Sequence, residues 1–414
     1  MTGGLKGSQI LQIATEIRDL RSRGETVCDL TVGDFSPQHF PIPEKLRDGI
    51  ASAIMRGETN YPPAAGILEL RQAVRRFYLR DLGLDYPVES IMITCGARPV
   101  IYGTYRAVCD PKDRVLYPVP SWNNHYYVHM VEATGVPIPT SAASRFLPTP
   151  EQIIEHLAGA RLISLNSPLN PTGTAIEPEA LRGICEAVLN ENRRRETRGE
   201  RPVYLLYDHI YWMLSVGETP HVTPSELFEE MARYTIYVDG ISKGFAATGV
   251  RVGWAVGPVD IVARMRAVLS HAGAWAPRAE QCATTEWLDD VEGIAAYQSE
   301  FKKAISARLN KVYEGLMAMK GRGCPVDAIP PMGAIYLTVR IAPFGRRTEG
   351  GAVLDDSEAV RSYLLEEARI GIVPFAAFGV SGDDGWFRFS VGATSLEEIE
   401  DALPRLEKAL LALS

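Results

Sequence analysis

Two periodicities of apolar and polar residues alternate through the first two-thirds of the chain. Short apolar runs of the kind that form buried strands lie at residues 90–96, 114–120, 161–168, 202–211, 235–243 and 251–258. Before and between them, apolar residues three or four positions apart predict helices at residues 42–57, 67–83, 97–109, 123–135 and 177–193. Apolar strands that alternate with helices predict a mainly parallel sheet covered by helices on both faces.

The last third of the chain follows a different pattern. One long helix is predicted at residues 292–318, and after it come strands at 334–341, 366–379 and 386–392 and a final helix. With an amphipathic helix at 8–23, these elements predict a smaller α+β domain formed by both chain ends. We therefore expect an N-terminal segment (1–48) packing with the small domain, a large domain (49–290), and a linking helix with the small domain (291–414).

The composition of the chain limits the kinds of partner that it is expected to bind. The 414 residues carry a formal net charge of −8, which argues against nucleic acid or an anionic membrane as the main partner. No apolar run is long enough to span a membrane, and the N-terminus has no signal-peptide pattern. The six cysteines are scattered, and His125 and His129 have no further ligand nearby, so we expect free thiols, no metal and a cytoplasmic location.

Polar, aromatic and small residues follow the predicted strands where a core would need apolar ones. In chain order these strand ends carry Gly96, Ala97 and Arg98, then Ser121 and Trp122, then Asn170 to Gly173, then Asp208 and Tyr211, then Ser242 and Lys243. In open α/β sheets, ligands bind outside the carboxyl ends of the strands. Five consecutive ends of this character predict one binding site along that edge.

Lys243 and Asp208 together suit one cofactor. A lysine amine in a partly desolvated pocket loses its proton more readily and forms a Schiff base with an aldehyde. A carboxylate at the neighbouring strand end keeps a pyridine nitrogen protonated. Pyridoxal 5′-phosphate (PLP) needs both groups to act as an electron sink, so the pair predicts a PLP site.

The other residues along this edge can contact the same cofactor. Tyr211 and Asn170 can hydrogen-bond its phenolic oxygen, and Trp122 can stack on its ring. The glycine turn at residues 95–100 opens a helix whose N-terminus suits a phosphate, and Arg251 adds a fixed positive charge. Each residue alone is compatible with a cap, a turn or core packing; their joint placement favours the site.

Eight stretches stand in the order and approximate spacing of one enzyme family. They are NYPPAAGILELRQAV, ITCGA, VPSWNNHY, NSPLNPTG, YDHIYW, SKGFAATGVRVGW, PPMGAIYL and WFRFSVG. From about Thr31 to the C-terminus, the chain resembles the PLP-dependent class I/II aminotransferases of the aspartate aminotransferase fold (fold type I). The resemblance implies an α/β fold whose large domain holds a mainly parallel seven-stranded sheet sandwiched by helices.

The resemblance also implies a role for each matching residue. Lys243 would hold PLP as an internal aldimine and then shuttle a proton, with Asp208 at the pyridine nitrogen and Tyr211 at the phenolic oxygen. The other cofactor contacts would be Ala97, Arg98, Trp122, Asn170, Ser242, Arg251 and the partner subunit's Tyr61. Substrate contacts would be Gly33, Trp122, Asn170, Arg98 and Arg388, the last gripping the α-carboxylate. Because Tyr61 would serve the neighbouring active site, a homodimer with active sites at the interface is implied.

Two positions depart from the family pattern. The family commonly has a serine three residues before the lysine, where it contacts phosphate, and this chain has Gly240. One phosphate hydrogen bond is therefore missing, and Ser242 does not automatically supply it. Residues 374–379 read PFAAFG where the family usually has a proline-glycine pair, so we expect a differently shaped loop near the substrate.

Arg98 points to a substrate class. A prokaryotic subgroup of the family has a lysine here that reads the distal carboxylate. We therefore expect Arg98 to favour dicarboxylic substrates such as aspartate and glutamate, unless its side chain faces solvent and only its amide binds. The expected function is transfer of an amino group between an L-amino acid and a 2-oxo acid in two ping-pong half-reactions.

Other functions stay open on the sequence alone. The same pocket can run a C–S β-lyase, cyclase or decarboxylase reaction, because the cofactor does the chemistry and the protein selects the bond that breaks. A non-catalytic ligand-sensing domain is a further class. Such regulators carry an N-terminal DNA-binding module, for which a match beginning near Thr31 leaves no room, and the presence of both Lys243 and Asp208 favours catalysis.

Overall fold

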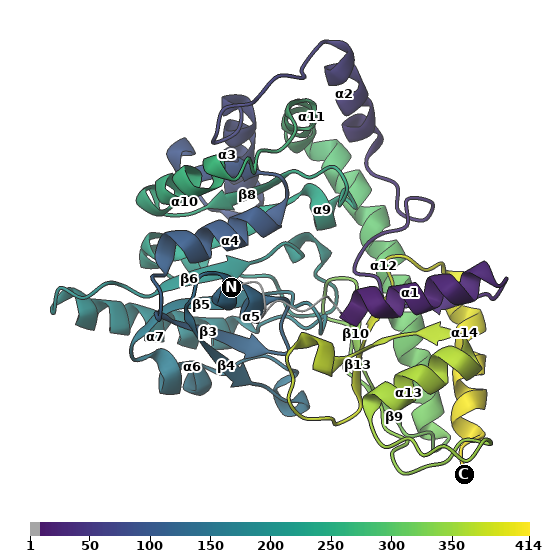
Figure 1. Ribbon diagram of the computed structural model, residues 1–414. Helices are drawn as coiled ribbons and strands as arrows, with labels where there is room; N and C mark the ends of the chain where they lie inside the picture. Colours follow the sequence, from purple (N-terminus) through teal and green to yellow (C-terminus); the bar gives the residue numbers. More distant parts are fainter. Residues whose placement is uncertain (1–8) are drawn as a thin grey trace.

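The computed structural model describes residues 9–414 as a large α/β part and a smaller part joined by one long helix (Figure 1). The large part holds a seven-stranded sheet in the order β2-β8-β7-β6-β5-β3-β4. Its strands are Ile91–Thr94 (β2), Arg114–Val119 (β3), Thr134–Pro139 (β4), Ala160–Asn166 (β5), Tyr204–Asp208 (β6), Thr235–Gly240 (β7) and Gly253–Val256 (β8). Only β8 runs antiparallel to its neighbours. The expected mainly parallel seven-stranded sheet is confirmed.

Side chains from β2, β3, β5, β6, β7 and β8 enter two separate apolar cores, one on each face of the sheet. On β6, Leu205 and Tyr207 belong to one core, and Leu206 belongs to the other. The first core includes helices Leu68–Leu82 (α3), Pro178–Glu196 (α7) and Arg278–Leu288 (α11), and the second includes Ala97–Val108 (α4) and Val259–His271 (α10). Because side chains alternate along a strand, an unbroken apolar run supplies both layers, which is why the strands read as continuous apolar segments.

The segment 123–135, predicted as one helix, forms two elements. Asn124–Met130 is helix α5, and Thr134–Pro139 is β4, which pairs with β3 at the edge of the sheet. Pro137 and Pro139 cannot continue a helix, but an edge strand tolerates residues that lack an N–H donor. The remaining helices of the large part are Glu44–Met55 (α2), Pro150–Leu157 (α6), Pro224–Leu227 (α8) and Ile241–Gly244 (α9).

The smaller part is built on a four-stranded antiparallel sheet in the order β12-β13-β10-β9. Its strands are Val326–Ala328 (β9), Tyr336–Ile341 (β10), Val373–Pro374 (β12) and Trp386–Ser390 (β13), and its helices are Val291–Gly321 (α12), Ser357–Tyr363 (α13) and Leu396–Leu411 (α14). The strand predicted at 366–379 is wrong in detail. That segment contains Ile370–Gly371 (β11), then β12, then a 3-10 turn at Phe375–Phe378, which begins directly after Pro374.

The N-terminal elements lie against the smaller part. Cys28–Asp29 (β1) pairs in parallel with β11, and Glu16 on Gln9–Ser22 (α1) forms an ion pair of 2.8 Å with Arg361 on α13. Residue 8 of the predicted helix lies outside the described residues. No helix within residues 9–414 is both long and apolar enough to cross a membrane.

Candidate active site

The carboxyl ends of the strands bring the predicted residues to one edge of the large sheet. Asp208 is the last residue of β6, and Ala97 opens α4 shortly after β2 ends at Thr94. Lys243 lies on α9, a single helical turn, and not on the strand predicted at 235–243, because β7 ends at Gly240. A Cβ on Gly240 would lie 2.7 Å from both Gly253 Cα and Val252 O, so the backbones of β7 and β8 meet here without room for a side chain.

The Lys243 amine is held by the chain's N-terminal loop. Its Nζ donates a 2.6 Å hydrogen bond to the carbonyl of Gly33, a residue that the family resemblance implied as a substrate contact. Burial lowers the pKa of Lys243 to about 8; nearby Asp34 raises it, and the cations Arg388, Arg98 and Arg251 lower it further. At pH 7 about a tenth of an amine with this pKa is neutral, far more than for an ordinary lysine, and the neutral form is the nucleophile that makes a Schiff base.

The carboxylate of Asp208 is buried, and few contacts compensate for its loss of hydration. Within residues 9–414 it forms no ion pair, and the hydrogen bond to its side chain comes from the Ile210 N–H at 3.2 Å. Burial raises the pKa of Asp208 to about 7. Together with Trp122 and Asn166, Asp208 lines a small pocket at the sheet edge. A cationic ring nitrogen placed there would stabilise the ionised carboxylate.

Arg251 lies against the N-terminus of α4. Its Nη1 donates to Thr248 O at 2.6 Å and its Nη2 to Cys95 O at 2.9 Å, and it makes no ion pair in the described part of the chain. A Cβ on Gly96 would come within 2.1 Å of Arg251 Nη2, so glycine is required for this approach. The guanidinium and the first N–H groups of α4 converge on a place suited to a phosphate.

Arg388 on β13 is a buried cation without an acidic partner. Its side chain is 1% exposed, its Nη1 donates to Asn170 Oδ1 at 3.1 Å, and its Nη2 donates to the Thr31 carbonyl. Its Nε has no hydrogen-bond partner, and no carboxylate within residues 9–414 forms an ion pair with it. Burying an uncompensated guanidinium is costly, and a carboxylate ligand would remove that cost.

Tyr336 is a site residue that the sequence reasoning missed. Its hydroxyl lies 2.7 Å from the Tyr211 hydroxyl, and its ring centroid lies 4.7 Å from Arg388 Cζ. In the sequence it stands within PPMGAIYL, where it has the pattern of an ordinary strand residue. Nothing in the sequence indicates that β10 places it against Tyr211.

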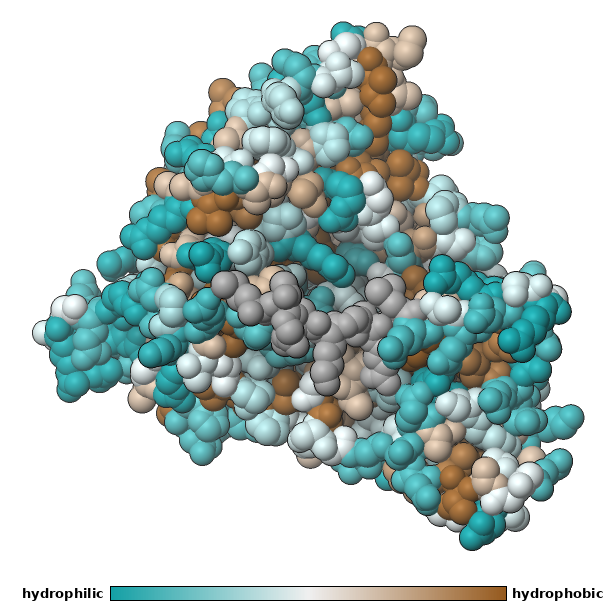
Figure 2. All heavy atoms as spheres, viewed as in Figure 1, coloured by the Kyte–Doolittle hydropathy of each residue, from teal (hydrophilic) through white to brown (hydrophobic). Residues whose placement is uncertain are grey.

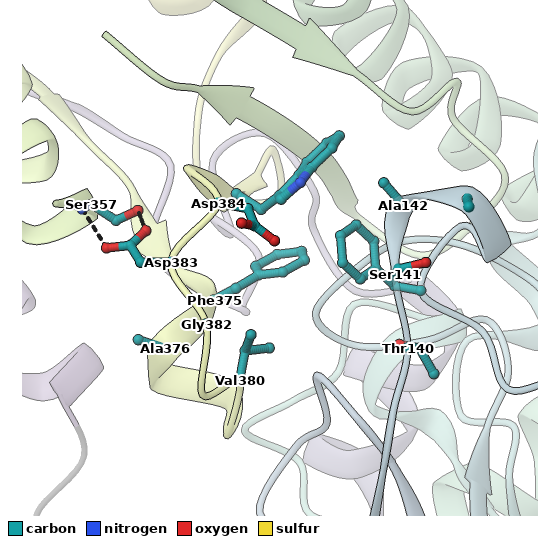
Figure 3. A pocket seen from close by; sticks show the side chains of 13 residues that line it. Thr140, Ser141, Ala142, Ser357, Phe375, Ala376, Val380, Gly382, Asp383 and Asp384 are labelled. Atoms are coloured by element: carbon teal, nitrogen blue, oxygen red, sulfur yellow. Dashed lines mark hydrogen bonds between the residues drawn. The ribbon is translucent and has the colours of Figure 1, made fainter. Parts of the chain in front are cut away.

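Trp122 is flanked by Arg98 and by the atypical loop at 374–379. Arg98 is exposed, and its Cζ lies 5.6 Å from the Trp122 ring centroid, so the side chain covers the aromatic ring. The ring centroid of Phe378 lies 6.3 Å from that of Trp122 and 5.0 Å from Arg388 Cζ. Phe375, Ala376 and Val380 face a separate cavity next to Thr140 and Ser141 (Figure 3).

Tyr61 lies apart from these residues. It is 83% exposed, packs on Trp275 with ring centroids 5.5 Å apart, and lines a cavity with residues 275–280. Ile54 and Met55 on α2 are exposed as well, and apolar atoms gather along that helix in Figure 2. The structure therefore does not bring Tyr61 together with Lys243 in one chain.

Within residues 9–414, three charged groups in this site lack partners of opposite charge, and their chemistry matches PLP with its substrate. The Asp208 carboxylate suits the pyridine nitrogen, Arg251 with the α4 N-terminus suits the phosphate, and Arg388 suits a substrate carboxylate. Lys243 supplies the amine for the aldehyde. The residues present fit this cofactor.

Comparison with known proteins agrees with the geometry. The family model for class I and II aminotransferases matches residues 25–406. The chain belongs to this family. It is therefore a PLP-dependent aminotransferase, which confirms the resemblance inferred from the motifs.

The aminotransferase is similar over nearly its whole length to relatives named aspartate aminotransferase. It is 32% identical over 410 residues to the aspartate aminotransferase of Rhizobium meliloti (strain 1021), covering 98% of this chain and 94% of the relative. The crystal structure of an aspartate aminotransferase from Rhizobium meliloti matches with a TM-score of 0.90 at 31% identity, covering 100% of this chain and 98% of that one. Aspartate aminotransferase from Thermus thermophilus with maleate matches with a TM-score of 0.86 at 28% identity, covering 99% and 98%.

Proposed function

We propose that the enzyme transfers the amino group of a dicarboxylic L-amino acid, such as aspartate or glutamate, to a 2-oxo acid in two ping-pong half-reactions. The observation that carries transfer from an amino acid is Arg388, a buried guanidinium that has no carboxylate partner within residues 9–414 and lies in the same site as the Lys243 amine. The relatives named aspartate aminotransferase support the substrate class, as does the relative solved with maleate, a dicarboxylate.

The cofactor contacts follow from the placement of charge. Lys243 would hold PLP covalently, Asp208 would pair its ring nitrogen, and Trp122 would stack on its ring. The amides of Ala97 and Arg98 with the Arg251 side chain would bind its phosphate. Ser242, buried on α9 beside Lys243, is a further candidate contact. Bound in this way, PLP supplies a ring that stabilises negative charge at the substrate α-carbon.

The chain's own residues would then bind the substrate and move its proton. Arg388 would grip the α-carboxylate through parallel hydrogen bonds while Asn170 and Gly33 hold it in place. Lys243 Nζ would take the proton from the substrate α-carbon. Tyr211 and Asn170 would donate hydrogen bonds to the phenolic oxygen of the cofactor. The amino group lost by the first acid passes to the second, so one amino acid and one 2-oxo acid are consumed and one of each is formed.

Absorbance and product analysis test this proposal. PLP added to the cofactor-free protein should give a visible band that aspartate or glutamate converts and that 2-oxoglutarate restores. Lys243→Ala should abolish the covalent band. Release of pyruvate or ammonia without an acceptor would contradict transamination and favour a lyase.

Arg98 is proposed to read the distal carboxylate of the substrate. Its position over Trp122 at the open side of the site supports this reading. Arg98→Ala should lower kcat/KM for aspartate about tenfold and leave a neutral amino acid nearly unaffected, since one charge-assisted pair is lost. Equal losses for both substrates would refute the assignment.

We also propose a homodimer in which the partner subunit's Tyr61 reaches the cofactor phosphate. The strong exposure of Tyr61 and Met55 supports an interface there. Mixing Lys243→Ala with Tyr61→Ala subunits tests it. If Tyr61 serves the other subunit, one site of each mixed dimer has both residues and activity returns. If Tyr61 serves its own chain, no site recovers.

Two further expectations remain proposals. The division into residues 1–48, 49–290 and 291–414 is supported at its second boundary by α12 beginning at Val291 and in general by the separate apolar cores, whereas the boundary at 48 falls inside α2, whose Leu46 belongs to the core of the large part. A cytoplasmic location is supported by the six cysteines, all of which are free thiols.

A further inference from the structure

Tyr336 lies where the cofactor side and the substrate side of the site meet. Its hydroxyl is 2.7 Å from the hydroxyl of Tyr211, whose ring centroid lies 5.7 Å from Lys243 Nζ, and its own ring lies against the Arg388 guanidinium. Tyr336 is 1% exposed, so water does not compete for these contacts. It belongs to β10 of the smaller sheet, whereas Tyr211 follows β6 of the large sheet.

The surroundings fix the Tyr336 hydroxyl. A Cβ on Gly33 would lie 2.7 Å from it, so the loop that accepts the Lys243 hydrogen bond packs directly on this oxygen. Across β10 and β13, Thr338 is opposite Arg388, which keeps Tyr336 and Arg388 in register on neighbouring strands. Within residues 9–414, Tyr211 is the side chain that hydrogen-bonds the Tyr336 hydroxyl.

We propose that Tyr336 is a positioning residue that orients the Tyr211 hydroxyl toward the cofactor and links it to Arg388. This inference rests on the proposed role of Tyr211 at the phenolic oxygen. When Tyr336 donates to Tyr211, the Tyr211 O–H has only the phenolic oxygen to donate to. A hydroxyl that accepts one hydrogen bond also becomes a stronger donor in the next one.

Charged groups around the pair set its protonation. Burial is the largest cause of the raised pKa of both tyrosines. Arg388 lowers the pKa of each; Asp208 raises that of Tyr211 and Asp34 raises that of Tyr336. Both hydroxyls are protonated in the working range, so they act by hydrogen bonding. A carboxylate bound to Arg388 would offset the positive charge beside the Tyr336 ring. Through the Tyr336 hydroxyl, this change would also affect the hydrogen bonding of Tyr211.

Tyr336→Phe tests the link because it removes the hydroxyl and keeps the ring over Arg388. The readout is the pH midpoint of the visible absorbance of bound PLP. Weakening the Tyr211 hydrogen bond destabilises the ionised phenolic oxygen, so the midpoint should rise by about 0.5 pH unit. KM for aspartate should stay nearly constant while kcat falls. Tyr336→Leu should shift the midpoint equally and raise KM as well, because the ring is also lost.

A double-mutant cycle with Tyr211→Phe shows whether Tyr336 acts through Tyr211. Tyr336→Phe should add no shift in the Tyr211→Phe background. A control is Tyr363→Phe, which removes a hydroxyl that donates to Ala409 O at 2.7 Å in the smaller part and should leave the midpoint unchanged.

The outcomes separate the inference from the proposed function. An equal Tyr336→Phe shift in both backgrounds, or no shift when Tyr211→Phe gives one, overturns the link and leaves the enzyme assignment intact. No shift from Tyr211→Phe removes the role of Tyr211 and the link with it. Failure of the wild-type protein to form a PLP band overturns the proposed function itself.

Discussion

Arg388 Nη1 donates a 3.1 Å hydrogen bond to Asn170 Oδ1, and this contact joins the smaller sheet to the large one. Arg388 lies on β13, and Asn170 follows β5. The two residues are 218 positions apart in the chain. The candidate carboxylate site is therefore assembled from both parts of the protein.

Arg388→Lys should weaken substrate binding and spare the fold. Lysine keeps the charge but loses the planar pair of donors, so kcat/KM for aspartate should fall about 10- to 100-fold, mainly through KM. Steady-state kinetics measures the loss. Arg340→Lys is the matched control, because Arg340 is exposed on β10 and donates to the Asp384 carbonyl. Similar losses for both variants would contradict the role of Arg388.

Capture of PLP by the cofactor-free protein should quicken as pH rises, with a midpoint near 8. The neutral amine is the nucleophile, and burial lowers the pKa of Lys243 to about 8. Stopped-flow absorbance follows the reaction. Asp34→Asn should move the midpoint to lower pH, because Asp34 raises this pKa and an amide oxygen keeps the hydrogen bonds from Thr248 and Phe35. A midpoint near 10, the ordinary range of lysine, would refute the prediction.

Gly240→Ala should destabilise the protein by about 1–3 kcal/mol, since the new Cβ would collide with the backbone of Val252 and Gly253. Gly249→Ala is the control in the same segment. A Cβ there meets nothing within 4 Å, so its effect should stay within about 0.5 kcal/mol. Denaturant unfolding measures both. Equal stability of the two variants would show that β7 and β8 can separate. A serine at this position would place its Cβ against the same backbone atoms.

Asp208→Asn should stabilise the cofactor-free protein at pH 8. Burial raises the pKa of Asp208 to about 7, so the folded protein binds this proton more tightly than the unfolded chain. The stabilising contribution of Asp208 to the free energy of unfolding is fully present at pH values below the ordinary pKa of aspartate, and it is lost as the pH rises toward 7. The gain at pH 8 should be on the order of 1–3 kcal/mol and shrink below pH 5.

Thermal unfolding with and without PLP shows whether Asp208→Asn raises or lowers the stability of the protein. Bound PLP should stabilise the wild type more than Asp208→Asn, because only the carboxylate pairs with a cationic ring nitrogen. Burial also raises the pKa of Asp239 to about 7, so Asp239 causes a similar loss of stability with rising pH, and the Asp208→Asn variant keeps that loss. A variant less stable than wild type at pH 8 without cofactor would contradict the prediction.

The sequence determined the sheet and the order of residues along its edge. Strands buried on both faces read as continuous apolar runs, and polar residues at their ends are visible against that background. This contrast is why the sequence alone points to Asp208 and Lys243. Local errors came where two short elements share one apolar segment, as at 123–135 and 366–379, because periodicity does not mark a boundary between them.

Tertiary structure alone decided which side chains meet. Tyr336 against Tyr211, Arg388 against Asn170 and Gly33 against Lys243 are contacts between distant segments, and no local pattern encodes them. The close approach of β7 to β8 at Gly240 is likewise a matter of packing. The sequence by itself specified the chemical groups at the sheet edge through local periodicity. Their pairing and pKa values depend on burial and distance, which exist only once the two sheets have packed together.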